Sequence, residues 1–267
     1  MSLPPPLNES QISTISPILS GILSGCGVDG AYVEHYLVSL SPLAKGTFVD
    51  VYASDIEGAP VTKIASSQQL GHLEQYRLGA EEFPIRYGCQ PLNASQSVVL
   101  EERALVLENF LEERGFNFKQ IHTIANACAD ILNNSSHFRN TGLMLTDIGE
   151  QNIGICIRDN STRFSLVCLD SGALQIENGQ QYKRGFLFGR ENVAEFNVAA
   201  AQAVENLLGV LLSDYDRSVK SPEVAEAYNE LLDVARDVKT TRPKASLFDQ
   251  PDMTVAPARD NGEKIRS

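Results

Sequence analysis

Two short apolar stretches of the chain, residues 142–145 and 164–169, are each followed by polar side chains that can do chemistry. Asp147 and Asn152 come after the first stretch, and Asp170 comes directly after the second. A carboxylate can accept a proton from a substrate hydroxyl, and carboxylate and amide oxygens are good ligands for Mg²⁺. We therefore expect a chemical site at the ends of two buried strands.

The spacing of these residues resembles a segment of the protein kinase superfamily. Asp147-x-x-x-x-Asn152, then a strand hairpin, then Asp170-x-Gly172 is similar to the catalytic loop and metal-binding segment of that family. The resemblance implies that Asp147 orients the attacking hydroxyl and accepts its proton. It also implies that Asn152 and Asp170 hold Mg²⁺ against the phosphates of ATP.

Residues 44–52 extend this resemblance upstream, because they are similar to the glycine-rich loop that covers the phosphates. Gly46 matches the middle glycine, Phe48 the aromatic residue at the tip and Val51 the closing valine. The two outer glycines are absent. By resemblance, Gly46, Phe48 and Val51 are expected to contact the nucleotide.

Residues 61–64, Val-Thr-Lys-Ile, are similar to the strand whose lysine binds the α- and β-phosphates. This similarity implies a phosphate-binding role for Lys63, and an exposed strand lysine is the alternative. The helix expected at residues 67–82 should supply a glutamate that pairs with Lys63. The candidates are Glu74, Glu81 and Glu82, of which Glu81 is narrowly favoured because a loop normally separates the strand from the helix.

Residues 104–110 resemble the last small-lobe strand and the hinge that binds adenine through backbone groups. Glu108 and Phe110 would then be hinge residues; an ordinary amphipathic strand end is the alternative.

The sequence also departs from the kinase pattern around Asp147. Leu145 and Thr146 replace the usual histidine and arginine, so activation by loop phosphorylation is not expected. Gly149 replaces a lysine that would face the transferred phosphate, and Ser171 replaces the usual phenylalanine. These changes weaken the case for efficient catalysis.

Hydrophobic periodicity predicts an α+β protein, and the resemblance implies that its fold is bilobed and protein-kinase-like. Strand-like patterns and the one helix predict a small β-rich N-lobe over residues 41–110. Helical patterns at 118–132, 193–212 and 222–238 predict a reduced, mainly helical C-lobe over residues 111–240. Residues 241–267 are expected to form a flexible tail.

Residues 1–40 are rich in serine and contain no lysine or arginine. The first such residue of the sequence is Lys45. The segment resembles an export leader or a loosely packed arm, and Pro17 and Gly21 should weaken any helix in it. The missing positive region argues against a Sec signal. We therefore expect a cytoplasmic protein, or one secreted into a host cell.

The net charge of −12, from 34 acidic and 22 basic residues, disfavours nucleic-acid and membrane-surface binding. No apolar run reaches the about 18 residues that a membrane span needs. Five cysteines without a C-x-x-C pair indicate reduced thiols rather than a disulfide framework or a zinc site.

Taken with the resemblance, the sequence favours an ATP- and Mg²⁺-dependent protein kinase. Serine or threonine is the expected acceptor, and a bacterial effector acting on a host protein is the expected context. A pseudokinase that binds a partner is one alternative. A small-molecule phosphotransferase is another, although the short region after Asp170 leaves little room for its substrate pocket.

Overall fold

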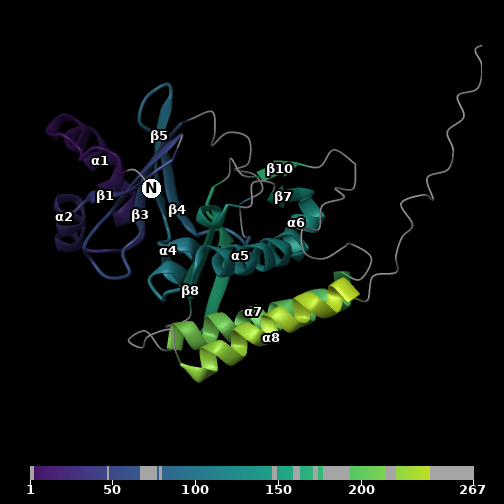
Figure 1. Cartoon of the computed structure of the whole chain (residues 1–267). Coiled ribbons are helices and arrows are strands. Elements are labelled where there is room, and N and C mark those ends of the chain that lie inside the picture. Colours follow the sequence, from purple (N-terminus) through teal and green to yellow (C-terminus); the bar gives the residue numbers. More distant parts are fainter. Residues whose placement is uncertain are drawn as a thin grey trace, which may run out of the picture.

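The computed structural model describes residues 3–46, 48–66, 77, 80–145, 149–158, 163–170, 174–176, 193–213 and 221–240. The first part of the chain forms a five-stranded antiparallel sheet in the order β1-β2-β3-β5-β4 (Figure 1). Valine-rich β5 is buried from residue 97 to residue 101, as expected of a strand covered on both faces. The strands are β1 (Ser41–Lys45), β2 (Val49–Ala53), β3 (Val61–Ser66), β4 (Arg86–Pro91) and β5 (Gln96–Glu101).

Two helices, α1 (Glu9–Gly25) and α2 (Gly30–Val38), pack against one face of this sheet (Figure 1). The Tyr36 hydroxyl of α2 lies 2.8 Å from the Thr62 hydroxyl of β3 and is fully buried. Residues 9–38 are therefore part of the folded core and not a loosely packed arm. The shared apolar core contains Ile15, Leu19, Leu23, Val33, Tyr36, Ala59, Val98 and Leu100.

Helix α1 continues through Pro17, contrary to the expectation that Pro17 and Gly21 would weaken it. Asn8 and Gln11 form a capping box in which each side chain accepts a hydrogen bond from the other residue's backbone N–H, at 2.9 and 3.0 Å. Proline removes one helical hydrogen bond, and the burial of the apolar face against the sheet offsets that loss.

The second part of the chain packs helices around a three-stranded sheet in the order β6-β8-β9 and a β7–β10 pair (Figure 1). The strands are β6 (Leu105–Val106), β7 (Leu143–Leu145), β8 (Ile153–Arg158), β9 (Arg163–Cys168) and β10 (Leu174–Ile176). The helices are α4 (Leu107–Glu112), α5 (Phe118–Asn133), α6 (Ser136–Thr141), the 3₁₀ turn η1 (Glu150–Asn152), α7 (Val193–Ser213) and α8 (Pro222–Thr240). Leu107, Ile124, Leu145, Ile153 and Leu207 are among its fully buried core residues.

The α+β class, with a β-rich first part and a mainly helical second part, is confirmed. Helices α1 and α2 precede the expected N-lobe, residues 41–110, and pack on its sheet. Of the helix expected at residues 67–82, Arg77 is helical and residues 80–82 are not, while the rest lies outside the described residues. The tail expected at 241–267 also lies outside them.

Candidate functional site

Lys63 lies on the face of the sheet opposite α1 and α2. Its neighbour Thr62 contacts Tyr36 of α2, and successive side chains of a strand point to opposite faces. Val51 of β2 is the direct cross-strand partner of Lys63, so the two side chains share that face. The sheet therefore presents Lys63 and Val51 together, as the kinase resemblance requires.

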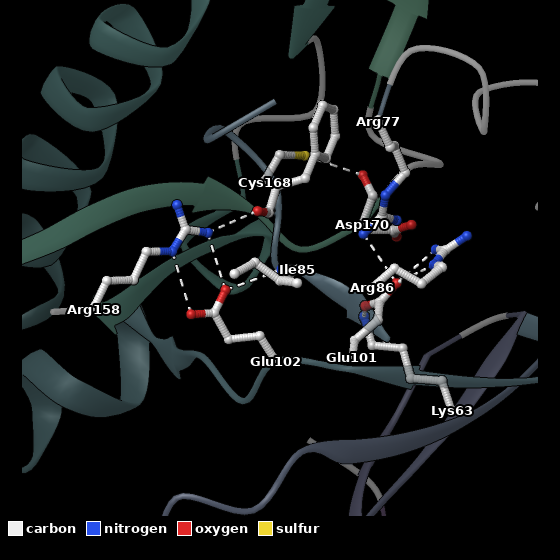
Figure 2. A network of polar contacts seen from close by, with 10 residues as sticks. Lys63, Arg77, Ile85, Arg86, Glu101, Glu102, Arg158, Cys168 and Asp170 are labelled. Atoms are coloured by element: carbon white, nitrogen blue, oxygen red, sulfur yellow. Dashed lines mark hydrogen bonds and ion pairs between the residues drawn. The ribbon is translucent and has the colours of Figure 1, made fainter. Parts of the chain in front are cut away.

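The ion-pair partner of Lys63 is Glu101 of β5. Lys63 Nζ lies 2.6 Å from Glu101 Oε2, and the Glu101 side chain is only 1% exposed. Arg77 Nη2 lies 2.9 Å from Glu101 Oε1, and Arg86 Nε lies 3.0 Å from the same oxygen (Figure 2). Burial alone would raise the pKa of Glu101, but the three cations lower it to about 2. Glu101 is therefore ionised at neutral pH.

The glutamate favoured by the sequence, Glu81, does not pair with Lys63. Its carboxylate binds Arg163 at 2.8 Å, and both side chains are more than half exposed. Glu82 contributes its backbone carbonyl, which accepts a hydrogen bond from Cys168 N–H at 2.8 Å. Glu74 lies outside the described residues. Among the described residues, Lys63 thus pairs with a carboxylate on a neighbouring strand, and the Glu74 candidate stays untested.

The β8–β9 hairpin brings Asn152 and Asp170 together. Asn152 immediately precedes β8, and Asp170 follows the end of β9. In the antiparallel register Ile153 pairs with Cys168, so Asn152 and Asp170 lie at the same end of the hairpin. The Leu169 N–H donates to the Asn152 carbonyl at 2.8 Å, which closes the open end of the hairpin. Gly154 permits this approach, because a Cβ there would lie 2.7 Å from the Leu169 side chain.

Asp170 lies near Lys63 and Arg77, two of the cations around Glu101, because all three affect the pKa of the buried Cys168 thiol. Burial raises the pKa of Cys168 to about 12; nearby Arg77 and Lys63 lower it and Asp170 raises it. The Cys168 thiol also donates to the Asp170 carbonyl at 3.4 Å. Figure 2 shows these groups between the sheet and the end of β9.

Asp147 lies outside the described residues, but both flanks of its loop are described. On one side, the Asn133 side chain accepts a hydrogen bond from Leu145 N–H at 2.7 Å and donates one to Leu145 O at 3.3 Å. On the other side, His122 of α5 lies 2.6 Å from Glu150 of η1. Helix α5 therefore anchors the residues before and after the predicted catalytic loop.

The turn between β1 and β2 contains Gly46 and Phe48. Gly46 N–H donates to Val49 O at 2.8 Å, and Phe48 is 59% exposed at the tip. Ser66 N–H donates to Phe48 O at 3.0 Å, which ties the turn to the end of β3. The role of this turn as a covering loop stays a prediction.

The expected hinge residues, Glu108 and Phe110, lie in helix α4. Phe110 is 4% exposed in the core of the second part, and the Arg114 guanidinium stacks on its ring at 3.7 Å. Glu108 lies in the first turn of α4, where burial and the charges of Glu112 and Glu150 raise its pKa. Helix α4 thus begins at Leu107, earlier than the strand pattern indicates, and the adenine-binding role of Glu108 and Phe110 stays a prediction.

Sequence reasoning missed Glu101, Arg77 and Arg86. One signal was available for the glutamate: an acid at the end of the apolar run 97–100 must be paired if it is buried. The arginines gave no comparable signal, because each is brought to Glu101 only by the tertiary fold.

Within the described parts of the chain, no group of three or more His, Cys, Asp or Glu side chains forms a metal site. Asn152 and Asp170 supply one amide and one carboxylate, which suits Mg²⁺ when substrate phosphates and water supply the other ligands. Among the same residues, no helix is both long and apolar enough to cross a bilayer.

Comparison with known proteins gives likenesses among solved structures, one of which is named below. The crystal structure of the PF14_0431 kinase domain is similar to this chain with a TM-score of 0.36 and 14% sequence identity. The match covers 53% of this chain and 52% of that one, so the chain spans about half of that protein's length. No protein-family model matches the chain, and no curated protein matches it in sequence.

Proposed function

We propose that the protein is an ATP- and Mg²⁺-dependent phosphotransferase of the protein-kinase type. The supporting observation is the arrangement of three polar groups from separate elements. Asn152 and Asp170 meet at the open end of the β8–β9 hairpin, and Lys63 stands on β3 with a buried carboxylate partner (Figure 2). Phosphoryl transfer depends on such positioning and charge stabilisation rather than on covalent chemistry by the protein.

In this proposal Lys63 binds the α- and β-phosphates, and Asn152 and Asp170 hold Mg²⁺ through side-chain oxygens. Mg²⁺ would neutralise charge on the phosphates. Asp147 would orient the acceptor hydroxyl and accept its proton. Gly46, Phe48 and Val51 would cover the nucleotide from the β1–β2 hairpin, in which Val51 is the cross-strand partner of Lys63.

The acceptor we propose is a serine or threonine hydroxyl of a protein, with a host protein as the substrate of a secreted effector. Two sequence features support this finer proposal. Only 20 residues separate Gly172 from Val193, which leaves little room for a small-molecule pocket. The serine content of the first forty residues resembles that of injected bacterial proteins, and here residues 9–38 are folded onto the sheet.

The test is transfer of radiolabel from ATP with Mg²⁺, to the protein itself and to a eukaryotic lysate. Asp147→Asn and Asp170→Asn should abolish labelling while leaving the thermal midpoint close to that of wild type. Asp233→Asn is the matched control, because Asp233 lies on α8 with its side chain 67% exposed, paired with Arg236. Labelling should persist in that variant.

Three other outcomes would overturn the proposal in different ways. A Mg²⁺-ATP thermal shift without labelling would indicate a nucleotide-binding pseudokinase. ATP turnover stimulated by aminoglycosides or amino alcohols, without labelled protein, would indicate a small-molecule kinase. No binding and no turnover would refute the kinase-type site itself.

A further inference from the structure

Three cations converge on a single buried carboxylate. Lys63, Arg77 and Arg86 all contact Glu101, and their side chains are 16%, 8% and 15% exposed. Asp170 lies in the same neighbourhood as Arg77 and Lys63, so two carboxylates face three cations and one positive charge is left over. Taking an uncompensated cation out of water is costly, so a cluster of this kind favours a further anion.

Most of the cluster is built into the sheet. Lys63 pairs with Val99 in the β3–β5 register, which places Glu101 two residues along on the same face. Arg86 of β4 is the direct cross-strand partner of Glu101. These three groups are therefore held by backbone ladders on adjacent strands, and their arrangement does not depend on the position of a helix.

Arg77 is the member that approaches from outside the sheet. Its guanidinium lies 5.0 Å from the centre of the Phe83 ring and donates through Nη2 to Glu101. Its Nε is buried and has no hydrogen-bond partner within the described part of the chain. A buried guanidinium N–H without an acceptor is rare, because the lost hydration is not replaced.

We infer that Lys63 and Arg77, positioned by Glu101, form a preformed anion site that binds the phosphate groups of the nucleotide. The inference rests on the proposed function and adds a second phosphate ligand to it. Arg77 supplies the unpaired Nε–H, and Glu101 acts as a positioning residue that orients both cations. Lys63 and Glu101 are fixed by the sheet, whereas Arg77 is brought to them from a helical position between β3 and β4.

The test compares nucleotides that differ in phosphate content. Dissociation constants for adenosine, ADP and ATP, with Mg²⁺ present, are measured by calorimetry for wild type, Arg77→Met and Arg77→Lys. Arg77→Met should weaken ADP and ATP binding about tenfold or more, the size of one charge-assisted hydrogen bond. Adenosine binding should be unchanged, and Arg77→Lys should restore part of the ATP affinity.

The matched control is Arg163→Met, because Arg163 is 58% exposed and pairs with Glu81 on the surface. It should bind all three ligands as wild type does. The Arg77→Met protein is expected to fold, since Glu101 keeps Lys63 and Arg86, and its thermal midpoint without ligand checks this.

Two results would overturn the inference while the proposed function stands. In the first, Arg77→Met binds ATP with the affinity of wild type. In the second, Arg77→Met loses equal affinity for adenosine and for ATP, which would show that Arg77 only supports the fold. Failure of the wild-type protein to bind ADP or ATP would instead refute the proposed function.

Discussion

The packing of α1 against the sheet makes a sharp prediction about two isoleucines of that helix. Ile15 is 1% exposed and belongs to the core shared with β5, whereas Ile12, one turn earlier, is 38% exposed. Replacing a buried isoleucine by alanine costs about 2–5 kcal/mol, because apolar burial is lost and a cavity remains. Ile15→Ala should therefore destabilise the protein strongly.

Ile12→Ala is the matched control, because it makes the same change in the same helix. Both substitutions raise intrinsic helix propensity equally, so the difference between them isolates the tertiary contact. We expect Ile12→Ala to cost less than about 1 kcal/mol. At about 2–4 °C per kcal/mol, a loss of about 3 kcal/mol in Ile15→Ala lowers the thermal midpoint by about 6–12 °C.

The assay is thermal and urea unfolding followed by far-ultraviolet circular dichroism, with both variants measured side by side. Equal and small effects of the two substitutions would refute the packing of residues 9–38 into the core. That result would restore the interpretation of the first forty residues as a loosely attached arm.

Two further predictions concern buried carboxylates whose pKa values shift in opposite directions. Lys63, Arg77 and Arg86 hold the pKa of Glu101 at about 2, below its ordinary value of 4.5, so folding favours the ionised form. This preference should contribute about 3 kcal/mol to the free energy of unfolding above about pH 4.5. The contribution should be lost as the pH falls toward 2. Urea midpoints between pH 6 and pH 3 check this, and a Glu101→Gln variant with an unchanged pH profile would contradict it. Burial raises the pKa of Asp130 from 3.8 to about 7, and its Oδ2 has no hydrogen-bond partner in the described part of the chain. Folding therefore favours the protonated form, and stability falls as the pH rises from about 4 to 7. Asp130→Asn should raise the free energy of unfolding more at pH 8 than at pH 5, by up to about 3 kcal/mol. A larger gain at pH 5 would show that the sign is wrong.

The elements that sequence periodicity predicted well bury one continuous face. The helix expected at 118–132 is α5, and the segments at 193–212 and 222–238 are α7 and α8. The hairpin strands around 153–157 and 164–169 are β8 and β9. In each case the apolar spacing is local and needs no knowledge of the partner element.

The elements that were missed depend on neighbours far away in the sequence. Strand β4 is an edge strand with mostly exposed side chains, so it has no apolar pattern. Its Gly88 would ordinarily indicate a turn, but Ile22 of α1 packs where a Cβ would lie, within 2.6 Å. The glycine therefore marks a close helix–strand contact, which only the tertiary structure reveals.

The candidate site was predicted in part for the same reason. Lys63, Asn152 and Asp170 stand at strand positions that motif spacing can locate. The carboxylate that pairs with Lys63 was sought on a helix, because motif order suggests that place. Glu101 instead lies on the strand adjacent to β3, and strand adjacency is a property of the sheet order β3-β5-β4 that spacing does not encode.

The packing of α1 on β4 and β5 also has a consequence for synthesis on the ribosome. The helix is complete at residue 25, but its partner strands end only at residue 101. At about 5–20 residues per second, the apolar face of α1 waits about 4–15 s for the sheet that covers it. During that interval a nascent chain exposes Ile15, Leu19 and Leu23 together, which makes this helix the natural binding site for a chaperone acting during translation.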